Sequence, residues 1–313
     1  MHGLVVKTTG NLYTVRGDDG VSVCCKAKGN FRLRGIRSTN PVAVGDRVTF
    51  TPPTDPTTPE GYITEIDDRT NYIVRKASNL SKQSHILAAN IDLVLLLVTI
   101  ARPDTSTTFI DRFLASAEAY GVPVHIAFNK TDELTPPELD LLGQLEATYT
   151  HIGYPCTRIS ALTGQGLHTL VPTLQAKTTL LAGHSGVGKS TLLNALIPSA
   201  HARTAHISAA HGTGMHTTTY SQLFELPQGG CLIDIPGIKG FGTFNLEPEE
   251  VTHYFPDLFQ LSHDCRFSNC THTHEPGCAV LQALDQGSLP LSRYNSYLSI
   301  LNDKEEGKYR AAY

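Results

Sequence analysis

The stretch Gly183-His-Ser-Gly-Val-Gly188-Lys189-Ser190 has the spacing G-x-x-x-x-G-K-S of a phosphate-binding loop. It follows the apolar run TTLLA and precedes STLLNALI, so it stands between a predicted strand and a predicted helix. Glycines let backbone N–H groups curl around phosphates, and the helix N-terminus adds partial positive charge. The stretch therefore predicts a nucleotide-binding α/β domain, and the context argues against a chance glycine-rich turn.

Two residues of this loop have specific expected roles in binding the nucleotide and its metal ion. Lys189 would reach the β- and γ-phosphates, and the Ser190 hydroxyl would bind Mg²⁺. The residues expected to surround the nucleotide phosphates are Gly183, His184, Ser185, Gly186, Val187, Gly188, Lys189, Ser190 and Thr191.

The sequence around the loop alternates between strand-like and helix-like stretches. Compact apolar runs, typical of strands buried on both faces, cover Ile91–Val98, Val122–Phe128 and Thr178–Ala182. Helical stretches cover Thr108–Tyr120, Pro136–Thr148 and Gly188–Leu196. This alternation predicts a parallel sheet with crossover helices, preceded by a linker with a short helix at residues 69–90.

Asn129-Lys130-Thr131-Asp132 ends one of these strands, where open α/β sheets bind ligands. The Asp132 carboxylate can accept hydrogen bonds from guanine N1–H and N2–H₂, a donor pair that adenine lacks. Asn129 can bond the other base edge, and Ser160-Ala161 is placed to support the base. The sequence thus predicts GTP and GDP as ligands. An ATP-dependent kinase or ATPase is the alternative, which Asp132 disfavours.

Asp234-Ile-Pro236-Gly237 follows another strand and supplies a carboxylate that would hold Mg²⁺, mostly through water. The Gly237 backbone N–H would contact the γ-phosphate. A threonine between the phosphate-binding loop and Asp234 would complete the Mg²⁺ shell. Our first choice is Thr218, and Thr217 is the second.

The order of these motifs is unusual. In ordinary GTPases the phosphate-binding loop comes first and the base-reading motif comes late. Here residues 129–132 and 160–161 precede the loop at 183, and Asp234 comes last, which indicates a circular permutation. The segment that senses the γ-phosphate therefore runs directly into the Cys/His-rich region after residue 245.

The usual water-orienting glutamine is missing, because Ile238 follows Gly237 directly. The best polar candidate to position the attacking water is His216, beside the proposed Mg²⁺ threonine. The alternative is an ordinary surface-loop histidine.

Residues 1–68 contain six short β-rich stretches separated by turn residues, which suggests a small barrel. Its basic residues gather near Phe31, as in hairpins that bind single-stranded or structured RNA. An ordinary solvated hairpin explains them equally well. The candidate RNA-binding residues are Lys26, Lys28, Arg32, Arg34 and Arg37.

The cluster Cys265-x4-Cys270-x-His272-x5-Cys278 offers three thiols and one imidazole. Four such ligands close a tetrahedral Zn²⁺ site with no open position, which makes the zinc structural rather than catalytic. A disulfide is the alternative, but it would leave one cysteine unpaired and is rare in a reducing cytoplasm. His263 and His274 lie at slightly different spacing.

Composition sets the remaining limits. The chain has 313 residues, 40% apolar and 17% charged, with seven Cys and a net charge of −4, which excludes extensive disorder, a disulfide scaffold and a generic polycation. The apolar run Ile91–Ile100 is too short to cross a bilayer, which takes about 20 residues, and the N-terminus lacks a signal-peptide pattern. We expect a cytoplasmic protein with no membrane partner, present as a monomer.

Taken end to end, these motifs resemble the RsgA (YjeQ) group of circularly permuted GTPases, which act in maturation of the small ribosomal subunit. The resemblance rests on Gly29-Asn-Phe31-Arg32, Val44-Gly45-Asp46, NKTD, GHSGVGKST, GMHTTT, DIPG and the Cys/His cluster. It implies an OB-fold barrel at residues 1–68, a permuted α/β GTPase domain at 69–245 and a zinc-binding α-helical domain at 246–313.

The same resemblance implies weak intrinsic GTP hydrolysis that the 30S subunit stimulates, with the 30S subunit and its rRNA as partners. The histidine that the family is thought to use corresponds to His216, while Met215 stands where the family usually has Arg. A rival interpretation is an RNA-binding assembly protein in which GTP is only a conformational ligand. The intact Mg²⁺ residues favour hydrolysis.

We predict that Asp132→Asn shifts the nucleotide preference from GTP toward xanthosine triphosphate. The change keeps the size of the side chain but replaces an acceptor oxygen with a donor amide, and the 2-oxo group of xanthine accepts that bond. Competition binding measures the shift. An unchanged affinity for GTP in the variant would show that Asp132 does not read the base.

Overall fold

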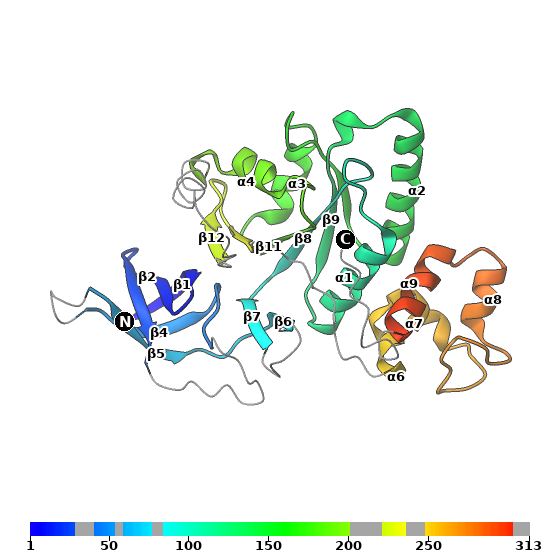
Figure 1. Ribbon diagram of the computed structural model, residues 1–313, viewed down its shortest axis with the longest axis horizontal. Helices are drawn as coiled ribbons and strands as arrows, with labels where there is room; N and C mark the ends of the chain where they lie inside the picture. Colours follow the sequence, from blue (N-terminus) through cyan, green and yellow to red (C-terminus); the bar gives the residue numbers. More distant parts are fainter. Residues whose placement is uncertain (29–40, 54–58, 77–83, 201–220, 236–247, 303–313) are drawn as a thin grey trace, which may run out of the picture.

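The computed structural model describes residues 1–28, 41–53, 59–76, 84–200, 221–235 and 248–302. A barrel lies at one end of the molecule, a helical lobe at the other and an α/β sheet between them (Figure 1). The strands are β1 (His2–Thr9), β2 (Leu12–Gly17), β3 (Ser22–Ala27), β4 (Arg47–Thr51), β5 (Gly61–Ile66), β6 (Tyr72–Lys76), β7 (Ser84–Ala89), β8 (Leu93–Val98), β9 (Val124–Phe128), β10 (Cys156–Arg158), β11 (Thr178–Ala182), β12 (Ser221–Glu225) and β13 (Cys231–Asp234). The helices are α1 (Thr107–Ala119), η1 (Thr131–Glu133), α2 (Pro136–Ile152), α3 (Leu167–Leu174), α4 (Lys189–Leu196), α6 (Pro248–Val251), η2 (Thr252–Tyr254), α7 (Pro256–Ser262), α8 (Ala279–Asp285) and α9 (Leu291–Leu301).

The predicted N-terminal barrel is confirmed. Its strands pair in the order β1-β2-β3-β5-β4, and β4 pairs back with β1 to close the ring. Alternation along the strands turns apolar side chains inward, where Val5, Tyr13, Val15, Cys25 and Phe50 form the core. Five of the six β-rich stretches form β1–β5, and the sixth, at residues 30–35, lies outside the described residues.

The segment at residues 69–90, predicted as a linker with a short helix, contains the antiparallel pair β6–β7, and residues 77–83 between the two strands lie outside the described residues. Strand pairing buries Ile73 and Ala88, and Ile73 joins the core of the central sheet. The base of the pair is held by Asn71, whose side-chain amide bonds both backbone groups of Ile91 at 2.7 and 2.8 Å. Pairing lets each strand satisfy the backbone N–H and C=O groups of the other.

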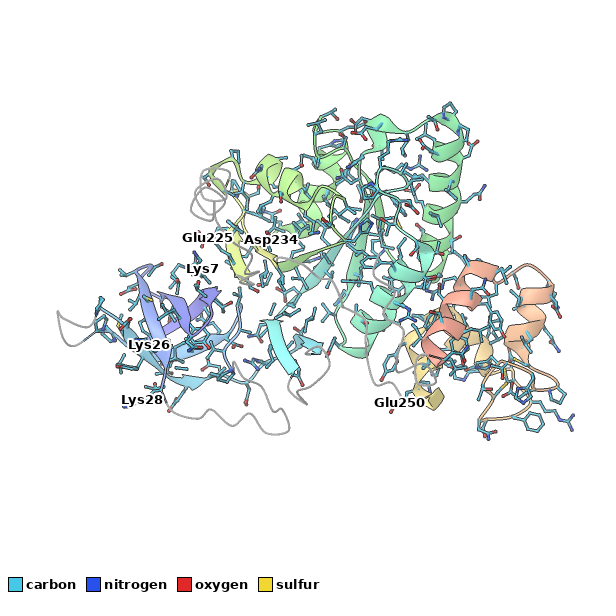
Figure 2. All side chains as sticks on the ribbon, viewed as in Figure 1. Lys7, Lys26, Lys28, Glu225, Asp234 and Glu250 are labelled. Atoms are coloured by element: carbon cyan, nitrogen blue, oxygen red, sulfur yellow. The ribbon has the colours of Figure 1, made fainter. Side chains whose placement is uncertain are left out.

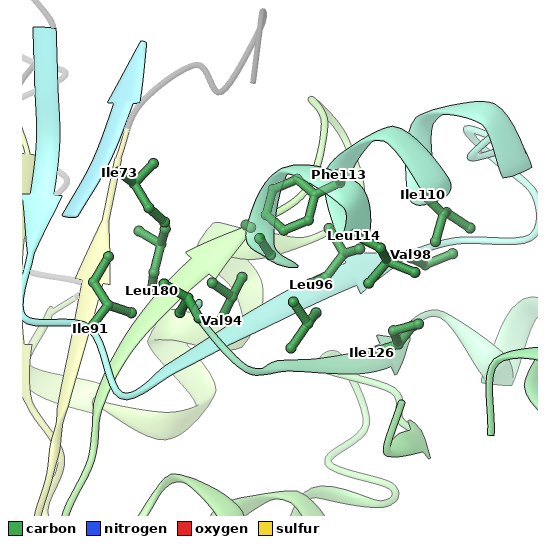
Figure 3. Packing of buried hydrophobic residues seen from close by; sticks show 14 of the residues in the cluster. Ile73, Ile91, Val94, Leu96, Val98, Ile110, Phe113, Leu114, Ile126 and Leu180 are labelled. Carbon is green, nitrogen blue, oxygen red and sulfur yellow. The ribbon is translucent and has the colours of Figure 1, made fainter. Parts of the chain in front are cut away.

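The central sheet has the predicted parallel core, in the order β10-β9-β8-β11-β13, with β12 antiparallel at its edge. Val94, Leu96 and Val98 of β8 face α1, where they pack with Phe113 and Leu114 (Figure 3). The alternate β8 residues face the opposite way, onto α3 and α4. Every residue of β8 is buried, which explains its continuous apolar run.

Within the described residues, one continuous sheet of 11 strands joins the barrel to the α/β part, because β1 also pairs with β12. Lys7 lies opposite Gln222 and Thr8 lies opposite Ser221. Arg16 of β2 adds an ion pair with Glu225 of β12. The barrel is therefore bonded directly to the edge strand of the central sheet.

The C-terminal lobe packs α9 against α1 through a buried ion cluster. Arg293 is 1% exposed and contacts Asp111 of α1 at 2.8 Å and Asp257 of α7 at 2.6 Å. Burial by itself lowers the pKa of Arg293, but the two carboxylates more than offset that effect and the pKa is raised. Tyr149 of α2 donates a further hydrogen bond to Asp111 at 3.0 Å. This cluster fixes the lobe on the α/β part.

No helix within the described residues is long and apolar enough to cross a membrane.

We predict that Arg293→Met lowers the free energy of unfolding by about 3–5 kcal/mol, because it leaves Asp111 charged and buried without its cation. Urea unfolding, together with amide hydrogen exchange in α9, measures the effect. Arg158→Met is the control, since Arg158 pairs with Glu146 at a half-exposed site and should cost less than about 1 kcal/mol. Equal losses in the two variants would contradict the role of the buried cluster.

Candidate functional site

The phosphate-binding loop connects β11 to α4 and depends on its glycines. Gly183, Gly186 and Gly188 have φ angles of 135°, 88° and 99°, which side chains with a Cβ rarely adopt. A Cβ at Gly183 would also lie 2.6 Å from the carbonyl oxygen of Leu97 on β8. The loop can therefore sit tightly against the neighbouring strand only with glycine at this position.

Lys189 and Asp234 place opposite charges at the carboxyl ends of β11 and β13. The Lys189 Nζ donates to the carbonyl oxygens of Gly183 and His184, at 2.6 and 2.8 Å. Burial lowers the pKa of Lys189 and raises that of Asp234, and each charge partly offsets the shift of the other. The ammonium thus stands inside the loop with two carbonyl bonds that phosphate oxygens could replace.

Asn129 connects the phosphate-binding loop to the segment at 160–161. Its side chain is buried, its Nδ2 donates to the Val187 carbonyl at 2.8 Å, and its Oδ1 accepts from the Ala161 N–H at 2.9 Å. From the sequence, we expected the Asn129 amide to bond one edge of the guanine base. In the structure, both its nitrogen and its oxygen bond protein backbone instead. Any direct contact of Asn129 with the base remains a prediction.

The rest of the NKTD motif faces outward from the same edge of the sheet. Lys130 has a left-handed backbone with φ of 62°, and its Nζ donates to the Arg102 carbonyl at 2.6 Å. Thr131 bonds the Ile159 carbonyl through both its N–H and its hydroxyl. Asp132 is exposed on η1 and has no hydrogen bond to another described residue, so its carboxylate is open to a ligand.

Ser190 and Thr191 are exposed at the start of α4, and Ser185 is exposed in the loop. Ser160 is buried, and its hydroxyl accepts from the Thr163 N–H at 3.1 Å, which stabilises the turn below Ala161. The remaining candidates, His216, Thr217, Thr218 and Gly237, lie outside the described residues.

Residues that follow β8 also contact the phosphate-binding loop, and the sequence did not predict this contact. The Thr105 hydroxyl lies 2.8 Å from Nε2 of His184, and Phe109 meets the same imidazole edge to face with ring centres 5.6 Å apart. Thr105 also accepts from the Thr99 N–H at 3.1 Å. No motif marks these residues, since their role depends on the adjacency of β8 and β11.

The Cys/His cluster is assembled as its spacing predicted. The four candidate ligand atoms of Cys265, Cys270, His272 and Cys278 lie within 4.8 Å of one another. Nδ1 of His272 is 3.4 Å from the sulfur of Cys278 and 3.6 Å from that of Cys265, and the two sulfurs are 3.9 Å apart. A tetrahedron with metal–ligand distances of about 2.0–2.3 Å has edges of about 3.3–3.8 Å, so these residues fit a bound metal.

Two tyrosines of α9 hold the Cys/His cluster in place. Tyr294 donates to the His272 carbonyl at 2.7 Å, and Tyr297 donates to the Thr271 carbonyl at 2.9 Å, which anchors the cluster to α9. All seven cysteines lie in the described ranges and none forms a disulfide. His263 and His274 stay outside the cluster.

Of the candidate RNA-binding residues, Lys26 and Lys28 are described and lie on the barrel (Figure 2). Lys26 forms an ion pair with Glu60 at 3.2 Å, and Lys28 is exposed. Arg32, Arg34 and Arg37 lie outside the described residues.

Two family models match the chain. The RsgA N-terminal domain matches residues 2–63, and the RsgA GTPase matches residues 66–244. Among curated relatives, the small ribosomal subunit biogenesis GTPase RsgA of Bacteroides fragilis is 60% identical over 313 residues and covers all of both chains. The protein of the same name from Porphyromonas gingivalis is 59% identical over 316 residues and also covers both chains fully.

Solved structures agree with this grouping. YjeQ from Thermotoga maritima is 35% identical with a TM-score of 0.75, and the match covers 99% of each chain. YloQ, described as a circularly permuted GTPase, is 31% identical with a TM-score of 0.72 and covers 99% of this chain and 96% of its own. With the NKTD motif before the phosphate-binding loop and Asp234 after it on one parallel sheet, the chain belongs to the RsgA (YjeQ) family of circularly permuted small ribosomal subunit biogenesis GTPases.

Proposed function

We propose that this protein hydrolyses GTP to GDP and phosphate, binds the 30S ribosomal subunit and its rRNA, and assists late maturation of that subunit. The single observation that carries the proposal is the bridge made by Asn129, which brings the phosphate-binding loop and the base-reading segments to one edge of the sheet. The full-length similarity to proteins named small ribosomal subunit biogenesis GTPase supplies the partner.

In this proposal the chain's own residues orient the nucleotide at both ends. Asp132 reads the guanine edge, while Lys130, Thr131, Ser160 and Ala161 shape its pocket. Lys189 turns from the Gly183 and His184 carbonyls toward the β- and γ-phosphates. The Gly237 N–H donates to the γ-phosphate.

Bound Mg²⁺ would neutralise charge that develops on the phosphates. The oxygen ligands available to it are the Ser190 hydroxyl, the Thr218 hydroxyl and the Asp234 carboxylate, the last through water. His216 orients the attacking water, because Ile238 cannot. Ribosome contact would bring His216 into place.

In this proposal the N-terminal barrel and the C-terminal lobe contact the ribosome. We assign residues 1–68 to an OB-fold that contacts RNA through its basic face, residues 69–245 to the GTPase domain and residues 246–313 to a domain held by one structural Zn²⁺. The zinc ligands are Cys265, Cys270, His272 and Cys278, and the mutual distances of their atoms support this assignment. The working unit is a monomer.

The direct test of the function is GTP hydrolysis measured with purified 30S, 50S and 70S particles. We expect strong stimulation by the 30S subunit. A single-turnover assay without phosphate release on any particle would instead favour an assembly protein for which GTP is only a conformational ligand.

We predict that metal analysis finds about one zinc per chain and that Cys270→Ser lowers this content. Structural zinc supplies folding free energy on the order of 10 kcal/mol in small domains, so its removal should unfold the C-terminal lobe and spare nucleotide binding. Cys24→Ser, at an exposed cysteine on β3, is the control and should keep its zinc. Protein purified without chelator that contains no zinc would refute the site.

We predict that His216→Ala lowers the 30S-stimulated rate about 10²-fold or more and leaves GTP affinity nearly intact, as expected when a water-orienting group is lost. Ser190→Ala should weaken both nucleotide binding and turnover, because it removes a Mg²⁺ ligand. His151→Ala, at an exposed histidine of α2, is the control. Normal hydrolysis by His216→Ala on the 30S subunit would assign the water to a ribosomal or backbone group.

A further inference from the structure

A cavity of about 570 Å³ lies where the barrel meets the central sheet. One wall comes from β1, β2 and the start of β3, and the other from β12 and the residues that follow α4. We call it the junction groove and define it by six polar residues of its lining: Lys7, Thr14, Arg16, Ser22, Gln222 and Glu225. Lys7 and Glu225 lie near each other at this boundary in Figure 2. The volume is in the range of small-ligand sites, which is about 300–1,000 Å³.

The chemistry of the groove suits phosphate groups. Lys7 is partly buried and has no ion pair or hydrogen bond with another described residue, so its charge is available. Arg16 donates to Glu225, but a guanidinium has five N–H donors and one carboxylate cannot use them all. The hydroxyls of Thr14 and Ser22 add further donors beside these cations. Two cations and one carboxylate leave the lining with a net positive charge.

The groove also touches both ends of the segment that carries His216 and Thr218. Its lining includes Ala200, after which the described chain stops, and Gln222, next to Ser221 where it resumes. The sequence from Lys177 to Thr219 contains no acidic residue, so nothing in that stretch repels a polyanion.

Strand register connects the groove to the nucleotide site in a straight line. Lys7 lies opposite Gln222, and Gln222 lies opposite Asp234 on β13. Asp234 in turn lies opposite Leu181, two residues before the phosphate-binding loop begins. A ligand held by Lys7 is therefore two strand pairings away from the proposed Mg²⁺ carboxylate.

We infer that the junction groove binds the phosphate backbone of an RNA segment of the small subunit, and that this contact stimulates GTP hydrolysis. The inference rests on the proposed function and specifies where RNA acts. An RNA strand in the groove contacts Lys7, Arg16 and the strand β12 at once. It thereby contacts the strand that pairs directly with β13, which carries Asp234.

The first test is Lys7→Met, with Lys177→Met as the matched control. Lys177 is exposed, does not line the groove, and its charge acts on His125 of β9. Lys7→Met should raise the Kd for 30S subunits about tenfold, as expected for loss of one hydrogen bond to a charged group. The slope of log affinity against log salt should fall by about 0.7–0.9, the value for one phosphate contact. Lys177→Met should match the wild type in both measurements.

The second variant, Glu225→Gln, should strengthen binding to 30S subunits rather than weaken it. It removes the carboxylate from the groove and frees Arg16, so 30S affinity and stimulated hydrolysis should rise. A role of the Arg16–Glu225 pair in stability alone predicts a loss instead. A fall in 30S affinity on Glu225→Gln would therefore overturn the inference, even if Lys7→Met had failed to fold.

A photoreactive side chain at Ser22 tests the identity of the occupant. Cross-links to rRNA support the inference, whereas cross-links to ribosomal protein alone overturn it. Wild-type protein that 30S subunits do not stimulate refutes the proposed function. Wild-type protein that is stimulated, with both Lys7→Met and Glu225→Gln unchanged, refutes only the groove.

Discussion

Parallel strands end at the same edge of a sheet, and the arrangement of the whole nucleotide site depends on that constraint. β8, β9, β11 and β13 run parallel, so the loops that follow them meet although they are far apart in sequence. The buried amide of Asn129 then locks two of these loops together, with one bond to Val187 and one to Ala161. Circular permutation changes the order of the loops along the chain but leaves this edge unchanged.

The helix α1 links the nucleotide edge to the C-terminal lobe. Phe109, in its first turn, contacts His184 of the phosphate-binding loop. Two residues further on, Asp111 accepts from Arg293 of α9 in a site without solvent. The metal cluster is anchored to α9 through Tyr294 and Tyr297. The lobe thus reaches the phosphate-binding loop through contiguous packed groups.

At the opposite side, β1 and β12 make the barrel and the central sheet continuous. Pairing with β1 covers the outer edge of β12 at Ser221 and Gln222, which would otherwise expose unpaired backbone groups. The same pairing sets Lys7, Gln222 and Asp234 in one register. The barrel that we propose to contact RNA is therefore joined by hydrogen bonds to the strand that follows the proposed catalytic segment.

The sequence by itself determined the parts whose chemistry depends on local spacing. The glycines at 183 and 188, the Lys189-Ser190 pair and the Cys/His spacing at 265–278 specify backbone shape and ligand sets within a few residues. Continuous apolar runs likewise identified β8 and β11, because only strands covered on both faces require them. The strand pair β6–β7 was missed, because its burial comes from contact with a distant core rather than from a local period.

Only the tertiary structure decided which distant groups meet. In the structure the amide of Asn129 bonds the backbone of Val187 and Ala161, whereas the sequence had suggested a bond to the base edge. It brought Thr105 to His184, closed the ion cluster of Arg293 and formed the groove beside Lys7. None of these contacts has a signature in sequence, because each depends on strand order and helix packing that bring together residues with no fixed separation along the chain.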